Sequence, residues 1–412
     1  MHRTGGRVMA LMVLMTSAAV QAETPQVFGF ARAGVSASDA PTSWHEGGWG
    51  RYLADEDDAS IDIEAQFALL WEPSLEWRLF AQALVRGDAA GRGEHAGLVE
   101  AYAERTMFFG NDQRLRLRAG QFFLPTSREA VDPLWQSRYT LGLSALNSWI
   151  AEEARPIGLD LSWRSPAESA REWELAATGV IGNDSSGALL AWRGFAQHDR
   201  LSVLGEVLPL PALDSLSDDG AFGHQRDDGT KPFGPDLDGR TGYAWRARYG
   251  DPHRFRVLAT VSDNRGDRGL HRGEYAWRTR YALLGGEWQP GEHWMLAGEW
   301  IDGDSGMGLR TGPHVDLDFS AAYLLASWAP DDDWRWSARI ERYEIIDRDA
   351  VAEDNSDDGH TLTLSLLHGF AGNWRAGLEW LHGDSVHAAS AMINQTDDTG
   401  GDLWRIELRR SF

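Results

Sequence analysis

Apolar and polar residues alternate with a period of two along most of the chain after residue 26. In "IDIEAQFALLW" (61–71) every second residue from Ile61 to Trp71 is apolar, and "LRLRAG" (115–120), "FRVLATV" (255–261) and "HTLTLSLLH" (360–368) repeat the pattern. Such alternation predicts strands with one apolar and one polar face. Because no segment shows a convincing long period of 3.6 residues, the chain is predicted to be all-β.

The connections between these segments fall into two length classes that alternate along the chain. The short ones are "WEPSLEW", "FFGNDQRL", "WRSPAESAREW", "QHDRL", "YGDPHRF", "WQPGEHW", "WAPDDDWRW" and "GFAGNWR". The long ones are acidic and glycine-rich, at about 37–58, 87–95, 125–155, 182–187, 209–240, 264–273, 303–314, 348–358 and 385–401. Counting the segments between them gives about 18 strands, with 16 as the alternative and both ends on the short-turn side.

Segregated loop lengths are typical of a transmembrane antiparallel up-and-down β-barrel. Its strands cross the bilayer in about 9–11 residues, with short periplasmic turns and longer outer loops. The sheet must close on itself, because no backbone polar group in lipid can stay unpaired. The apolar face then meets lipid and the polar face lines the lumen.

Large aromatic residues flank the short turns on both sides. Tryptophan prefers the edge of the bilayer, because its ring is apolar while its N–H needs a polar partner. We therefore expect an interfacial belt at the periplasmic end, formed by Trp71, Trp77, Trp163, Trp173, Trp288, Trp294, Trp328, Trp334, Trp336 and the terminal Phe412.

The N-terminus and the charge sharpen this prediction. Residues 1–22 have the charged, apolar and small-residue order of a cleavable signal peptide, which leaves 23–412 as one barrel domain. Removing Arg3 and Arg7 takes the net charge from −23 to −25. A chain this acidic is not expected to bind nucleic acid, because it has no basic surplus for phosphates.

The last residues, "LWRIELRRSF", resemble the C-terminal strand signature of Gram-negative outer-membrane proteins, with Trp404, Ile406, Leu408 and Phe412 on one face. The resemblance implies insertion by the barrel-assembly machinery; Arg410 departs from the signature. "LRLRAGQFFLPTS" (115–127) is similar to the strand-to-loop segment of the phosphate-selective porin O/P family. This second resemblance covers about a dozen residues.

Many arginines fall on the polar face. The candidates for lining the pore and selecting anions are Arg78, Arg114, Arg116, Arg118, Arg246, Arg254, Arg256, Arg335, Arg339, Arg375 and Arg405, with Arg164, Arg248 and Arg409 in the same phase. Inward acids are Glu64, Glu174, Glu206, Glu299, Glu341, Glu379 and Glu407. Two interpretations stay open. Arginine and glutamate pair across strands and stiffen the wall, or surplus arginines form a constriction that favours anions.

The segment 125–155 is too apolar for a freely solvated outer loop. It is predicted to fold into the barrel as a constriction loop or, as the second interpretation, to contact a neighbouring protomer. The residues that would form the constriction are Arg128, Trp135, Arg138, Tyr139, Trp149 and Arg155.

We expect a porin for passive diffusion of small hydrophilic solutes that prefers phosphate-like or carboxylate anions. The alternatives are a substrate-specific channel or exporter for acidic saccharides, and an adhesive barrel with a closed lumen. An enzyme is not expected, since "LHGDSVH" offers His382, Asp384, Ser385 and His387 without an oriented nucleophile. A plugged receptor is not expected either, because this chain has no N-terminal domain large enough to fill the lumen.

The expected partners are outer-membrane lipid and lipopolysaccharide, small anionic solutes and, in a homotrimer, further copies of the chain. No cofactor and no resident metal are expected. "DNSDDG" (354–359) resembles a calcium loop but lacks the later acidic ligand, and a minor alternative is that divalent cations bridge the acidic loops to lipopolysaccharide.

Overall fold

The computed structural model describes residues 24–56, 59–87, 95–166, 171–223, 229–349, 351, 353–393, 396 and 398–412. The expected signal peptide lies outside these residues. No helix in the described part is long and apolar enough to cross a membrane.

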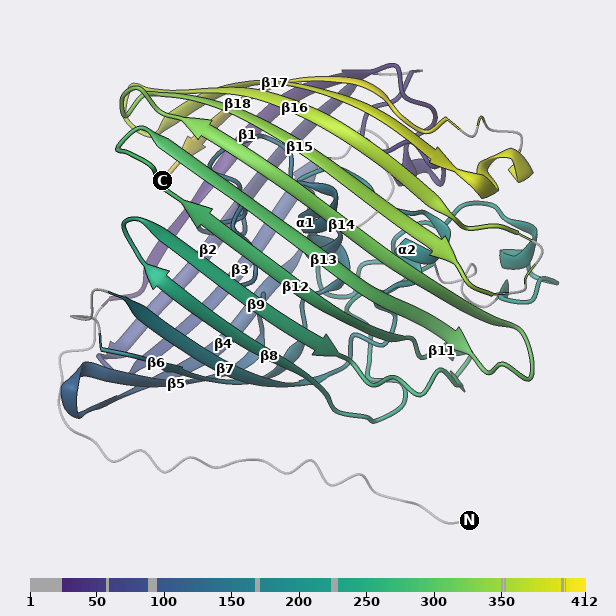
Figure 1. Ribbon diagram of the computed structural model, residues 1–412, viewed down its shortest axis with the longest axis horizontal. Helices are drawn as coiled ribbons and strands as arrows, with labels where there is room; N and C mark the ends of the chain where they lie inside the picture. Colours follow the sequence, from purple (N-terminus) through teal and green to yellow (C-terminus); the bar gives the residue numbers. More distant parts are fainter. Residues whose placement is uncertain are drawn as a thin grey trace, which may run out of the picture.

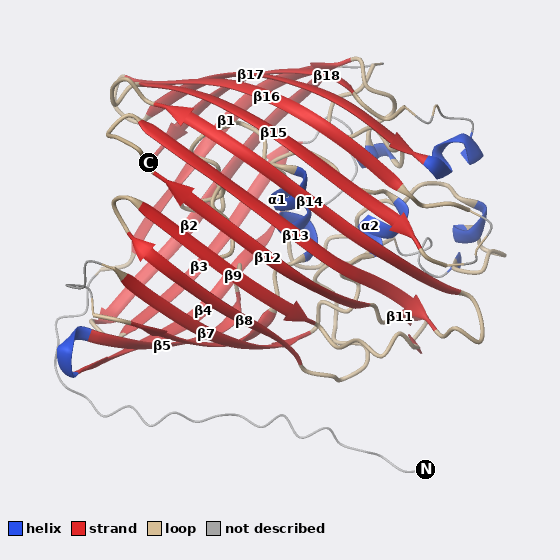
Figure 2. Cartoon of the chain, in the orientation of Figure 1, coloured by secondary structure: helices blue, strands red, loops and turns tan. Residues whose placement is uncertain are grey.

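The described chain forms one closed antiparallel barrel of 16 strands (Figures 1 and 2). Each strand pairs with its neighbours in the sequence, and β1 closes the barrel against β18. The strands are β1 (Gln26–Ser38), β2 (Ser60–Ser74), β3 (Trp77–Gly87), β4 (Ala96–Phe109), β5 (Gln113–Gln121), β6 (Ile157–Arg164), β7 (Glu172–Ile181), β8 (Gly242–Asp251), β9 (Phe255–Asp263), β12 (Arg278–Trp288), β13 (Trp294–Gly308), β14 (His314–Trp328), β15 (Trp334–Asp347), β16 (Asp357–Phe370), β17 (Trp374–His387) and β18 (Gly401–Ser411). The all-β barrel prediction is confirmed, with 16 strands.

The count of 18 is wrong because two of the expected strands do not exist. The segment around "QHDRL" belongs to one long connection between β7 and β8, which also contains helix α2 (Ala188–Trp192). Almost every residue from 188 to 203 is buried. Its apolar stretches, Ala188–Trp192 and Leu201 with Val203, pack inside the barrel and not against lipid, so in the sequence they resembled parts of two strands.

The remaining small elements lie in connections. They are helix α1 (Ala145–Glu153), the hairpin of β10 (Leu270–His271) with β11 (Glu274–Tyr275), and the 3₁₀ turns η1 (Trp44–Glu46), η2 (Gly110–Asp112), η3 (Asp214–Leu216) and η4 (Ala388–Ile393). The short turns gather at one end of the barrel, on the left in Figure 1, and the long connections gather at the other.

The tryptophans that flank the short turns lie on the outer face of the barrel wall. Trp294, Trp328 and Trp336 are cross-strand neighbours on β13, β14 and β15, and Trp334 stacks on His368 with ring centroids 4.0 Å apart. The terminal Phe412 lies 5.7 Å from the ring of Phe67. This arrangement orients the molecule, since short turns at an aromatic belt are periplasmic in such barrels.

Candidate functional site

The described parts of three connections fold into the lumen: 39–56 between β1 and β2, 122–156 between β5 and β6, and most of 182–216 between β7 and β8. Figures 1 and 2 show α1 and α2 within the outline of the barrel. Trp49 of the first connection donates its indole N–H to the carbonyl of Trp192 at the end of α2 (2.8 Å). The described parts of these connections therefore pack against each other as well as against the wall.

Carboxylates of the wall hold the connection 122–156 through its backbone. Glu379 on β17 accepts hydrogen bonds from the N–H groups of Leu141 and Gly142 (2.6 and 2.8 Å), and Glu341 on β15 accepts one from Ala145 (2.8 Å). Because Ala145 begins α1, Glu341 satisfies an N–H group at the helix N-terminus that has no intrahelical partner.

Arg339 on β15 lies at the centre of this anchoring. Its side chain has 0% exposure, and it pairs with Glu129 of the connection and with Glu341 (2.9 Å). It also donates to the carbonyls of Gly142 and Leu143 (3.0 and 3.2 Å). The guanidinium therefore binds groups of the protein at every nitrogen and has no contact with water.

Two adjacent glutamates at the end of α1 connect it to the segment of α2. Glu153 accepts from the backbone N–H groups of Gly187 and Leu189 (2.9 and 3.1 Å). Gly187 has φ +103°, and a Cβ there would lie 2.0 Å from the hydroxyl of Ser305, so only glycine fits. Glu152 forms a bidentate pair with Arg193 (2.7 and 2.8 Å).

The two glutamates ionise differently. Burial raises the pKa of Glu153 to about 7, despite the hydrogen bonds it accepts. Burial also acts to raise the pKa of Glu152, but Arg193 and His198 outweigh it and hold that pKa at about 2. An arginine partner thus decides which of the two carboxylates is charged near neutral pH.

The segment after α2 is anchored to the same part of the wall, on β1, β18 and β16. Asp199 pairs with Arg32 on β1 and with Arg405 on β18 (3.0 Å). Asp357 on β16 accepts from the N–H of Phe195 (3.0 Å) and pairs with Arg51 of the first connection. The sequence analysis did not single out Arg32, Arg51 or Asp199. Arg32 could have been found there, because the alternation in "FARAG" (30–34) places its side chain on the lumenal face.

The periplasmic mouth carries a different arginine arrangement, on β3 to β8. We call the following residues the inner-mouth cluster: Arg78, Arg116, Arg118, Arg164 and Arg248 around Glu104 and Glu174. Glu104 lies 2.8 Å from Arg118 and 3.7 Å from each of Arg78 and Arg116. Glu174 pairs with Arg248, Arg164 (2.7 Å) and Arg116 (3.6 Å).

The inner-mouth cluster has more positive than negative charge and is open to water. Five arginines face two carboxylates, and counting Glu72, which also pairs with Arg78 (2.6 Å), and Glu172, which lines a cavity with Glu174, leaves an excess of one positive charge. The side chain of Arg78 is 42% exposed and those of Arg164 and Arg248 are 34% and 27% exposed. A cavity of about 160 Å³ in this region is lined by Arg164, Arg248 and Arg256 together with Glu172 and Glu174.

The other predicted lining arginines are mostly paired. Arg246 binds Asp160 (2.6 Å), Arg256 binds Glu287 (3.2 Å), Arg375 and Arg409 lie 3.5 and 3.0 Å from Glu407, and Arg335 donates to Ser327 (3.0 Å). Arg114 lies over the ring of Phe108 (5.9 Å). Arg254, expected on a strand, instead lies exposed in the turn between β8 and β9, because β9 begins one residue later. Pairing with acids across the wall is thus common among these arginines, and Glu407 is shared by Arg375, Arg409 and Arg32.

The candidate constriction residues lie in or beside the inward connection 122–156. Trp135 stacks on Phe123 (4.1 Å), Trp149 donates to Glu153 (2.7 Å), Arg128 lies 3.5 Å from Glu287, and Arg155 donates to the carbonyl of Ser202 and lies over Phe123 and Phe233. Arg138 is exposed and pairs with Asp132 (2.7 Å), and Tyr139 lies under Arg335 (5.5 Å).

The residues of "LHGDSVH" are divided between the two faces of β17. His382 and Asp384 are exposed on the outer face, whereas Ser385 and His387 are buried inside the barrel. Ser385 accepts from Arg51 (3.1 Å) and bonds to Thr399 (3.0 Å). The strand therefore separates Ser385 from His382 and Asp384, which lie on the opposite face.

The fold, a closed antiparallel barrel of 16 strands with connections packed inside it, is that of the outer-membrane porins. The structure is similar to the trimer form of OmpT of Vibrio cholerae (11% identity, 94% of this chain and 99% of that chain, TM-score 0.52). It is also similar to the outer-membrane channel DcaP of Acinetobacter baumannii (9%, 97% and 100%, 0.51) and to an anion-selective porin from Comamonas acidovorans (10%, 94% and 99%, 0.51). No family model and no curated protein matches the sequence, so the likeness is one of fold.

Proposed function

We propose that the protein is an outer-membrane channel for small hydrophilic solutes that favours anions. The observation that carries the proposal is the inner-mouth cluster, where partly exposed arginines outnumber the carboxylates on one side of the opening. Rings of like charge set the selectivity of pores, and planar guanidinium groups suit phosphate and carboxylate oxygens.

A specific channel for acidic saccharides is the second candidate. It is favoured by the packing of three connections inside the barrel, which leaves less open width than a general diffusion pore of 16 strands would have. A chain of uronate-like carboxylates would meet successive arginines of the cluster.

The test is current through the mature protein in a planar bilayer under a tenfold KCl gradient. The expected reversal potential has the sign of chloride permeation, and Arg116→Glu with Arg118→Glu should move it toward potassium. The Gln pair at the same positions should move it about half as far, because it removes two charges rather than four. Arg105→Glu is the matched control, since Arg105 pairs with Glu76 (3.1 Å) on the outer face of β4.

Each outcome bears on a different part of the proposal. Zero conductance would reject the channel, and a potassium-selective wild type would reject the anion preference. An unmoved potential in the double variant, or an equal shift in the Arg105 control, would reject the inner-mouth cluster as its source. Blockage of the current by an oligouronate but not by acetate would favour the saccharide channel.

Assembly as a homotrimer is part of the proposal, because one of the similar structures is a trimer form. Mass measurement of the protein in mild detergent should then give three chains per particle, and a monomer would contradict this part alone.

A further inference from the structure

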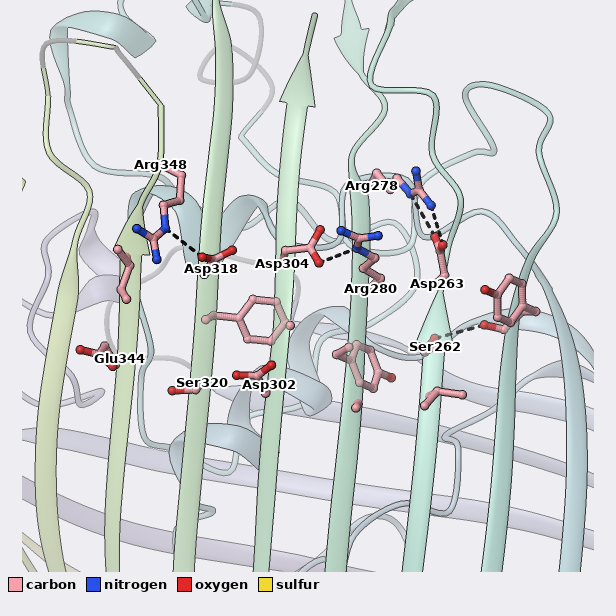
Figure 3. Close-up of a pocket in the computed structure, with 17 residues that line it drawn as sticks. Ser262, Asp263, Arg278, Arg280, Asp302, Asp304, Asp318, Ser320, Glu344 and Arg348 are labelled. Atoms are coloured by element: carbon pink, nitrogen blue, oxygen red, sulfur yellow. Dashed lines mark hydrogen bonds and ion pairs between the residues drawn. The ribbon is translucent and has the colours of Figure 1, made fainter. Parts of the chain in front are cut away.

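The outer face of the wall carries arginines near the long-loop end of β9 to β15, and three of them are paired. Figure 3 shows these three around a hollow of about 780 Å³. The ion pairs are Arg278 with Asp263 (2.8 Å), Arg280 with Asp304, and Arg348 with Asp318 (2.8 Å) (Figure 3). In each pair, an aspartate of the wall itself balances the charge of the arginine.

Arg342 lies on the same face of β15 as Arg348 but has no such partner. Its side chain is exposed, and its cross-strand neighbours are Ala322 and His360. Its guanidinium makes no hydrogen bond, ion pair or ring contact within the part of the chain that the structure describes. The counter-charge for this arginine must therefore come from outside the described wall.

The depth of Arg342 in the membrane indicates where that charge comes from. Arg342 is eight residues from Trp334 of the periplasmic belt (342 − 334), about 26 Å along a strand that rises about 3.3 Å per residue. At a strand tilt of about 40° this is about 20 Å of height, in a lipid-facing band about 25 Å tall. A long side chain at that depth can extend its charge to the headgroups of the outer leaflet.

An apolar hollow of about 620 Å³ on the outer face reaches up to Arg342. We call it the glycine hollow, and its rim consists of Leu284, Trp300, Leu324 and Ile340, which are 51%, 42%, 65% and 56% exposed. Its floor is formed by small residues of neighbouring strands, Gly286, Gly298 and Ala322. The hollow therefore presents an apolar groove to lipid below an unpaired cation.

The packing of the wall keeps this floor small at one position and leaves space at another. A Cβ at Gly298 would lie 2.8 Å from the side chain of Leu324 and 2.9 Å from the carbonyl of Tyr323, so a larger residue would clash there. A Cβ at Gly286 would have its nearest neighbour, the carbonyl of Arg256, 3.6 Å away. A side chain at Gly286 would thus fit and project into the hollow.

We propose that Arg342 and the glycine hollow bind one phosphorylated lipid of the outer leaflet, with the phosphate at the guanidinium and an acyl chain in the hollow. The planar donors of arginine suit phosphate oxygens. The hollow extends from Arg342 toward Gly286, which is two residues from Trp288 of the periplasmic belt. An acyl chain of the outer leaflet runs in the same direction, from its headgroup toward the centre of the bilayer.

Two acidic residues on the same face act against this binding. Asp302 and Glu344 lie near the long-loop end, two residues from Trp300 and from Arg342 along their strands. Neither carboxylate pairs with Arg342 in the described part of the chain, but both repel an anion bound there. Removing one of these charges should therefore strengthen lipid binding. The site lies on the outer wall and does not depend on conduction through the lumen.

The test is native mass spectrometry of the delipidated barrel in detergent, titrated with bisphosphorylated lipid A and with the same lipid after removal of its phosphates. Wild type should bind one bisphosphorylated molecule per chain at least fivefold more tightly than the dephosphorylated one. Arg342→Gln should reduce this preference to less than twofold, and Glu344→Gln should increase it. Gly286→Leu should weaken the binding of both lipids at least fivefold, because its side chain fills the hollow.

The matched control is Arg348→Gln, which removes a charge from the same face of β15 outside the glycine hollow and should bind both lipids as wild type does. Heat-modifiable migration in gels checks that each variant is folded, and Ala322→Leu replaces Gly286→Leu if the latter does not fold. Equal binding of the two lipids by wild type, or an unchanged preference in Arg342→Gln, would overturn the proposal. So would competition by soluble glucosamine 1-phosphate as strong as that by the lipid, because the hollow would then contribute nothing.

Discussion

Arginine has two different roles in two regions of the same lumen. In the filled part, Arg339 and Arg193 are enclosed, and each is matched by carboxylates that join an inward connection to the wall or to another connection. At the inner mouth, Arg116 and Arg118 share Glu104 with Arg78 and keep some contact with water. The difference shows that burial and the local charge balance, rather than residue type, separate an arginine that locks structure from one that can act on ions.

The largest expected effect is on stability, from truncating an arginine in each region. Arg339→Ala leaves Glu129 and Glu341 buried without their cation and should cost about 3–5 kcal/mol of unfolding free energy. Arg118→Ala should cost about 1 kcal/mol or less, because Glu104 keeps two other arginines and the site is partly solvated. Denaturant unfolding followed by tryptophan fluorescence measures both, and equal losses would erase the distinction.

A smaller effect should appear in how the stability of the filled region depends on pH. The pKa of Glu153 is raised to about 7 from its ordinary 4.5, so its contribution to stability is fully present below about 4.5 and is lost as pH rises through about 7. Glu153→Gln should therefore raise the melting temperature by a few degrees at pH 8.5 relative to wild type and do much less at pH 5.5.

Glu152→Gln provides the matched control for that experiment. The pKa of Glu152 is about 2, so the group is ionised throughout the range from pH 5.5 to 8.5. Losing its pair with Arg193 should lower the melting temperature equally at both pH values. A pH-independent effect of Glu153→Gln would show that this carboxylate does not titrate between them.

The smallest expected change in stability comes from added salt. Salt should weaken the selectivity of the inner-mouth cluster strongly and the stability of the filled region very little. Raising KCl from 0.1 to 1 M shortens the screening length from about 10 Å to about 3 Å. Anion preference should fall markedly because the inner-mouth cluster is solvated, whereas the melting temperature should hardly change because the buried pairs exclude ions. A large drop in melting temperature with unchanged selectivity would reverse the comparison.

Much of the fold could be predicted from local pattern. Alternation at period two sets which face of a strand meets lipid, so the outward Leu115 and Leu117 and the inward Arg116 and Arg118 followed from the sequence. The turns flanked by tryptophan also gave the end of the barrel at which those arginines lie. The strand count failed at 188–208, since apolar residues there such as Leu189, Leu190 and Leu201 pack inside the barrel, and local pattern does not distinguish that environment from lipid.

The candidate site was predicted only in part, for a related reason. The inward phase of Arg339 followed from the pattern, but its partner Glu129 is 210 residues away in the chain and reaches it through an inward-folded connection. Nothing local in the sequence separates that buried arginine from Arg118.

The sequence by itself determined that this chain is an antiparallel barrel with a lipid-facing side, a lumenal side and a periplasmic end. These properties depend on a period of two residues and on the preference of tryptophan for an interface, both of which act over a few residues. Only the tertiary structure decided which connections fill the lumen, which arginines are neutralised there and which keep an excess of positive charge. Those outcomes depend on distances between groups far apart in the chain, and the pairing of charges is settled only when closure of the barrel brings them together.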